Sequence, residues 1–218
     1  MNFSSRAIPS CWTAAWAPCC KLPGPEELNI TDPALIEGIH GQYAAAGSRI
    51  VNANTFGASA HKLAGSAYTL EQVITAGIEN CKRACAPYGA LTALDVGPLG
   101  ELLEPSGTLA FEDAVAEYAR IVKAGEAAGA DLIFFETYTD LYELKAALLA
   151  AKENTHLPIL ASMSFEAGGR TFTGCTVESF AATARGLGAD AVGINCSLGP
   201  KEIFPMAKRL AEAVPGNF

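Results

Sequence analysis

The sequence predicts an α/β fold built on parallel strands, because short apolar or β-branched stretches alternate regularly with stretches of helical length and are joined by short links. In each unit the polar residues gather at the C-terminal end of the strand-like stretch. A (β/α) barrel places its chemistry at that end of its strands. No glycine fingerprint follows a first strand, so we prefer the barrel to a doubly wound open sheet.

The elements can be placed one by one. An aspartate cap followed by a proline predicts a first helix over 32–46, which Gly47 ends. Residues 49–55 form a short β-branched run, and residues 131–137 have the continuous apolar character of a strand covered on both faces. The other expected strands are 91–96, 158–165 and 191–196, and the other helices are 69–84, 111–128, 141–151, 177–186 and 201–213.

This count is short of a complete barrel. About five strand–helix units and one leading helix are found, whereas a complete (β/α)8 barrel has eight units and roughly 250 residues. We therefore expect an incomplete TIM-type (β/α)8 barrel over residues 25–218, without a proper first strand and without about the last two units. Residues 1–24 are expected to be an irregular N-terminal segment.

Composition narrows the class of protein. A net charge of −8 and a sequence pI near 4.9 argue against nucleic acid as a partner, because a phosphate backbone would be repelled. No apolar run reaches the roughly 20 residues that a membrane span requires. Pro9, Thr13 and Pro18 interrupt the one stretch that could pass for a secretory signal. Seven cysteines without regular spacing favour reduced thiols and a cytoplasmic protein.

Eight short motifs follow one another in a fixed order along the chain. They are NITDP (29–33), NTFGA (54–58), GPLG (97–100), LEPSG (103–107), ETYTD (136–140), SMSF (162–165), GRTFTG (169–174) and GINCSLGP (193–200). Each motif is weak alone, and the ordered set is specific. Together they resemble the homocysteine S-methyltransferase family, which includes the homocysteine-binding module of cobalamin-dependent methionine synthase and betaine–homocysteine methyltransferase. The resemblance covers nearly everything from Glu26 to the C-terminus.

The resemblance implies a zinc ion held by three cysteine thiolates, with the homocysteine sulfur in the open fourth position. Zinc favours the thiolate, which is the nucleophile that attacks a methyl donor. Cys196 matches the first zinc cysteine, and the other two would form an adjacent pair in a later glycine-rich motif that does not follow it here. Cys19–Cys20 lies on the wrong side of the barrel order and is rejected. We therefore expect weak or absent zinc binding by this chain.

The resemblance also assigns substrate-binding residues. Glu136 matches the carboxylate that receives the amino group of homocysteine, and Asn54, Thr55 and Asn195 are weaker matches on the same rim. Taken alone, Glu136 could merely cap the following helix, and Cys196 could be a buried structural thiol. The surrounding motifs favour the site in both cases.

The three histidines match no ligand pattern, and we expect His40, His61 and His156 at surface or boundary positions. Cys81 and Cys85 are four residues apart and share a helix face. They could pair on a metal, but helix packing is preferred, because no second group of ligands accompanies them.

The family usually opens with a strand and loop of the type LLDGGMGTML, where this chain reads SCWTAAWAPCC over residues 10–20. Tryptophan has a single codon, so part of the DNA can be reconstructed. In the frame that starts at the third base of each codon, Trp12–Thr13 must encode aspartate and Trp16–Ala17 must encode glycine. With permitted third bases in the other codons, the shifted frame spells the family motif. The hypothesis is a frameshift in residues 1–24, with the frame restored before residue 25.

Two functions from different classes remain open. One is zinc-dependent transfer of a methyl group to the thiol of homocysteine, giving methionine; its partners are homocysteine and a methyl donor, and cobalamin or folate would be involved only if further modules exist. The alternative is a non-catalytic fragment of a methionine synthase-like protein. An aldolase is disfavoured, because no strand ends in a lysine. The sequence does not fix the methyl donor or the oligomeric state.

Overall fold

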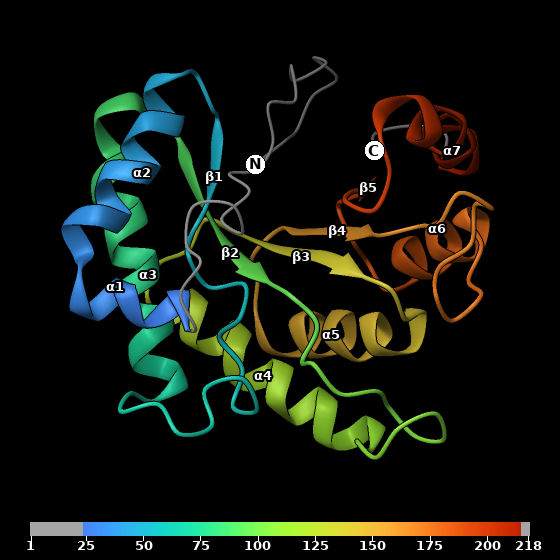
Figure 1. Ribbon diagram of the computed structural model, residues 1–218, viewed down its shortest axis with the longest axis horizontal. Helices are drawn as coiled ribbons and strands as arrows, with labels where there is room; N and C mark the ends of the chain where they lie inside the picture. The colour runs from blue at the N-terminus through green and yellow to red at the C-terminus, as the bar shows by residue number, and fades with distance from the viewer. Residues whose placement is uncertain (1–23, 215–218) are drawn as a thin grey trace.

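The structure is a computed structural model that describes residues 24–214 (Figure 1). Five parallel strands form one sheet in the order of the chain, so that each strand pairs with its sequence neighbours. This is the arrangement of five consecutive strands of a (β/α) barrel, and it confirms the predicted fold class. The strands are β1 (Ile50–Asn52), β2 (Leu91–Val96), β3 (Leu132–Tyr138), β4 (Ile159–Met163) and β5 (Ala191–Ile194).

The helices follow the outer side of the curved sheet, from α2 and α3 through α4 and α5 to α6 and α7 (Figure 1). All six expected helices are present, with bounds shifted by at most a few residues. The helical segments are η1 (Pro25–Glu27), α1 (Leu28–Thr31), α2 (Pro33–Ala45), α3 (Leu70–Cys85), η2 (Ala86–Tyr88), α4 (Phe111–Ala127), α5 (Leu141–Asn154), α6 (Val177–Gly186) and α7 (Pro200–Ala213).

Local sequence explains where the helices begin. The Asp32 side chain accepts a hydrogen bond from the Leu35 amide and caps α2, as the aspartate–proline pair predicts. A reciprocal capping box between Thr69 and Gln72 starts α3. These caps satisfy amide groups that have no partner inside the helix, so each helix starts at a defined residue.

Three strands are shorter than expected. The run 158–165 is a strand only over Ile159–Met163, the run 49–55 only over Ile50–Asn52, and the run 191–196 only over Ala191–Ile194. After the last of these strands, Cys196 and Ser197 have left-handed backbones, with φ of 58° and 62°, which are not compatible with an extended strand. The polar ends of the runs 49–55 and 191–196 thus lie in loops beyond the sheet.

The expectation for His40 is wrong. This side chain is fully buried on α2, in line with the buried residues Ile36 and Ala44, each four positions away along the same face of the helix. Burial lowers the pKa of His40 to about 4, so the ring is neutral at pH 7. The expectation holds for His61 and His156, which are exposed.

Apart from Gly24, the predicted irregular segment 1–24 lies outside the described residues, and so does Cys19–Cys20. Within residues 24–214, no helix is both long enough and apolar enough to span a membrane.

Candidate active site at the carboxyl ends of the strands

The sheet has one face toward the helices and one inner face. The inner face carries a separate apolar cluster of Ala93, Leu132, Phe134 and Leu160, apart from the main core beneath the helices. Side chains alternate along a strand, so the residues two positions after Ala93, Phe134 and Leu160 lie on this same face. Those residues are Asp95, Glu136 and Ser162. The inner face is therefore apolar at its base and polar at the carboxyl ends of its strands.

The Asn195 amide connects the ends of three neighbouring strands. Its Oδ1 accepts hydrogen bonds from the Thr137 amide at 3.1 Å and the Ser162 hydroxyl at 2.8 Å. Its Nδ2 donates to Thr137 Oγ1 at 2.7 Å and lies 3.3 Å from both Glu136 Oε2 and Cys196 Sγ. One amide thus spans the distance between the predicted amine-binding carboxylate and the predicted metal-binding thiol.

Cys196 is exposed at this edge, and its Sγ is 3.7 Å from Thr137 Oγ1. The backbones of Thr137, Cys196 and Ser197 all have positive φ values, of 67°, 58° and 62°. Residues other than glycine rarely adopt this conformation, and such residues concentrate at functional sites. The end of β3 and the loop after β5 therefore carry unusual backbones at the point where their side chains meet.

Two carboxyl groups lie side by side on the inner face. Asp95 is 2% exposed, and its side chain is within hydrogen-bonding range of Glu136. Burial, followed by the charge of Glu136, raises the pKa of Asp95 well above its usual range. Burial also raises the pKa of Glu136, while the adjacent Asp95 carboxyl group opposes that effect.

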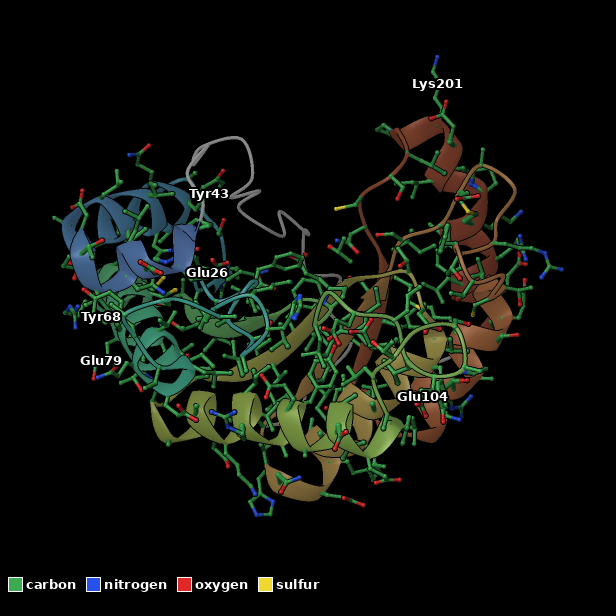
Figure 2. All side chains as sticks on the ribbon, turned by 60° about the horizontal axis from the view of Figure 1, so that its bottom comes forward. Glu26, Tyr43, Tyr68, Glu79, Glu104 and Lys201 are labelled. Carbon is green, nitrogen blue, oxygen red and sulfur yellow. The ribbon has the colours of Figure 1, made fainter. Side chains whose placement is uncertain are left out.

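Charged residues from neighbouring loops surround the pair. Glu26 Oε1 accepts a hydrogen bond from the Gly57 amide at 2.7 Å, which fastens the NTFGA loop. The Lys62 Nζ donates to the Pro98 carbonyl at 2.6 Å, and burial lowers the pKa of Lys62, whereas Glu26, Glu143 and Asp95 raise it. Lys201 projects from the start of α7, far from Glu26 (Figure 2).

The structure brings three of the five predicted site residues into direct contact, namely Glu136, Asn195 and Cys196. Asn54 and Thr55 are both buried and have partners elsewhere. The Asn54 amide donates to Asn29 Oδ1 at 3.0 Å and to the Pro25 carbonyl at 2.8 Å, so it fastens the N-terminal helical segments to the sheet. Thr55 Oγ1 accepts from the Asp95 amide at 3.1 Å and donates to the Asp95 carbonyl at 2.8 Å.

Asp95 is one of the polar strand-end residues noted in the sequence, but it was assigned no role, and Thr137 was not predicted. The place of Asp95 beside Glu136 could have been predicted from the alternation of β2, since it is a carboxyl group in an apolar strand on the same face. No signal in the sequence identifies Thr137, because its place depends on its left-handed backbone.

The described residues do not fit a three-thiolate zinc centre. Within residues 24–214, no group of three or more histidine, cysteine, aspartate or glutamate side chains could hold a metal ion. Of the four cysteines described, Cys81 and Cys85 are buried side by side with 3.8 Å between their sulfur atoms, and the Cys175 thiol donates to the Thr176 carbonyl. Cys196 alone places a thiol in the Asn195 network.

Comparison with known proteins identifies relatives of two kinds. The chain is 29% identical to methionine synthase of Mycobacterium tuberculosis over 200 residues and 30% identical to that of Mycobacterium leprae over 203 residues. These alignments cover 85% and 86% of this chain but only 16% of each relative.

Solved structures agree with the fold. The metallated form of the homocysteine methyltransferase MmuM from Escherichia coli superposes with a TM-score of 0.79 at 21% identity, over 91% of this chain and 76% of that one. Its apo form gives a TM-score of 0.72 at 22% identity, over 91% of this chain and 73% of that one. The sequence profile described as homocysteine S-methyltransferase matches residues 9–217. The chain therefore belongs to the homocysteine S-methyltransferase family.

Proposed function

We propose that the strand-end site binds the amino acid portion of homocysteine, in a domain whose role is methyl transfer to the homocysteine thiol to give methionine. The single observation that carries the proposal is the contact of the Asn195 amide with both Glu136 Oε2 and Cys196 Sγ. A carboxylate suits an ammonium group, and the family resemblance implies that the homocysteine sulfur lies near Cys196. The ammonium group of homocysteine would bind at the Glu136 end of this network, and its sulfur atom would lie at the Cys196 end.

Each residue has a separate task in this proposal. Glu136 accepts hydrogen bonds from the substrate ammonium group. Asn195 fixes the orientation of Glu136 and is itself fixed by the Thr137 amide and the Ser162 hydroxyl. Ser164 donates to the Asn195 carbonyl at 2.9 Å and so holds the backbone of the loop that carries Cys196. The whole network is supported from strand ends, which favours a precise geometry.

In this proposal, Cys196 is the one zinc ligand that the described residues supply. Bound zinc would supply a stabilised substrate thiolate, but the described residues contribute one of the three thiolates that the family resemblance implies. Further ligands would have to come from residues outside 24–214 or from a longer polypeptide. Any site for the methyl donor, or for cobalamin or folate, would likewise have to come from residues outside 24–214 or from a longer polypeptide. A cytoplasmic location, where thiols stay reduced, completes the proposal.

Calorimetry tests the binding step. Under reducing conditions the full chain should bind L-homocysteine more tightly than 4-mercaptobutyrate, which lacks the amino group. Glu136→Gln should reduce the ratio of the two affinities by about tenfold or more, because it removes the charge that faces the ammonium group. Glu104→Gln is the matched control, since Glu104 is an exposed residue in the loop after β2 (Figure 2).

Two results would contradict the proposal. Equal affinity for the two thiols would show that Glu136 does not receive the amino group. Failure of the folded chain to bind either thiol, with zinc or without it, would favour the alternative of a non-catalytic fragment.

A further inference from the structure

The Asp95 carboxyl group lacks the partners that a buried anion requires. It is 2% exposed, and its Oδ1 has no hydrogen-bond partner among the described residues. The Asn52 amide lies nearby but does not reach ordinary hydrogen-bond geometry with it. A buried carboxylate without donors is costly, and a second carboxylate at hydrogen-bonding distance makes it more so.

The neighbouring Glu136 carboxyl group is placed differently. It is half-buried and receives the Asn195 Nδ2 amide, so it has a donor on the side toward Cys196. Glu143, another buried carboxyl group, has two donors, the Leu99 amide at 2.7 Å and the Tyr118 hydroxyl at 2.9 Å. Asp95 is thus the member of the pair that is suited to be neutral.

We propose that Asp95 keeps its proton and donates it in a hydrogen bond to Glu136, so that the single negative charge of the pair is held on Glu136 in the orientation that receives the substrate ammonium group. Asp95 is a positioning residue that acts through Glu136. This inference rests on the proposed function for its role in binding, but the location of the proton can be tested without a ligand.

The direction in which the acid limit of L-homocysteine binding moves in Asp95→Leu distinguishes a protonated Asp95 from an ionised one. If Asp95 donates to Glu136, then Asp95→Leu removes a stabilising hydrogen bond from the Glu136 carboxylate. The acid limit of L-homocysteine binding then moves to higher pH, by about one unit for one lost charge-assisted hydrogen bond. If Asp95 is an anion, the same change removes a repelling charge and the limit moves to lower pH. The other charges acting on the pair, Glu26 and Lys62, are unchanged in both cases.

Infrared spectroscopy and a binding titration of the full chain together form the test. At neutral pH the wild-type spectrum should contain the carbonyl band of a protonated carboxylic acid, which Asp95→Asn removes and the control Glu143→Gln retains. Asp95→Asn keeps a donor in place, so its binding profile should stay close to that of the wild type.

Several outcomes would overturn the proposal. They are a wild-type spectrum without this band, a band that Asp95→Asn leaves intact, or a downward shift of the acid limit in Asp95→Leu. If the band behaves as expected but no variant binds L-homocysteine, the proposed function fails and the assignment of the proton stands. Should Asp95→Leu not fold, the infrared comparison decides the assignment alone.

Discussion

Asn195→Ala tests whether one amide holds the candidate site together. The substitution removes the acceptor of the Thr137 amide and of the buried Ser162 hydroxyl. Each of the two donors left without a partner costs about 1–3 kcal/mol, so we expect a loss of about 2–6 kcal/mol in the free energy of unfolding. In a chain of this size each kcal/mol corresponds to about 2–4 °C in Tm.

Urea denaturation followed by circular dichroism measures this loss. Asn154→Ala is the control, because the Asn154 amide donates to the Ala150 carbonyl at 2.7 Å in the last turn of α5, remote from the site. Its removal should cost no more than about 1 kcal/mol. Asn195→Asp keeps the acceptor but places a carboxylate oxygen toward Glu136, so it should be more stable at acidic pH than at neutral pH, relative to wild type. An Asn195→Ala variant within about 0.5 kcal/mol of wild type would refute the reasoning.

Three further predictions concern other parts of the chain. The folded-state pKa of His40, about 4, lies below its unfolded value, so the contribution of this group to stability is complete above about pH 6.5 and is lost as the pH falls toward 4. The wild-type free energy of unfolding should lose about 3 kcal/mol between pH 7 and pH 4 through this group, and His40→Leu should lack this part of the loss when both proteins are unfolded with urea. The same pH dependence in the two proteins would contradict the prediction. Elemental analysis of the dialysed full chain should give well below one zinc ion per chain, whereas tightly held stoichiometric zinc would show that residues outside 24–214 complete a site. Finally, the nucleotide sequence of codons 10–20 should read LLDGGMGTML in the frame that begins at each third base, and codons incompatible with that reading would exclude the frameshift.

Much of the fold follows from local patterns. β2 over Leu91–Val96 and α6 over Val177–Gly186 have the bounds expected from the sequence. Their limits are set by residues nearby in the chain, by a turn before β2 and by the Thr176 cap before α6. By contrast, the early end of β5 depends on left-handed backbones at Cys196 and Ser197, which neither residue type indicates.

The candidate site could be predicted only in part. Glu136 and Cys196 are identified by the motifs around them, and the order of parallel strands then places them at one edge. Asn54 does not join Glu136 and Cys196, because its amide group donates to Asn29, which is 25 residues earlier in the chain. Such long-range pairing leaves no local pattern. His40 could have been recognised as buried, since the spacing of Ile36, His40 and Ala44 follows one helix face.

The most direct test of the central claim is a crystal structure of the full chain with L-homocysteine, with zinc in the solution. We predict that the ammonium group lies within hydrogen-bonding distance of the Glu136 carboxylate and that the sulfur atom points toward Cys196. An amino acid bound elsewhere, or bound with its ammonium group away from Glu136, would contradict the assignment of the strand-end site.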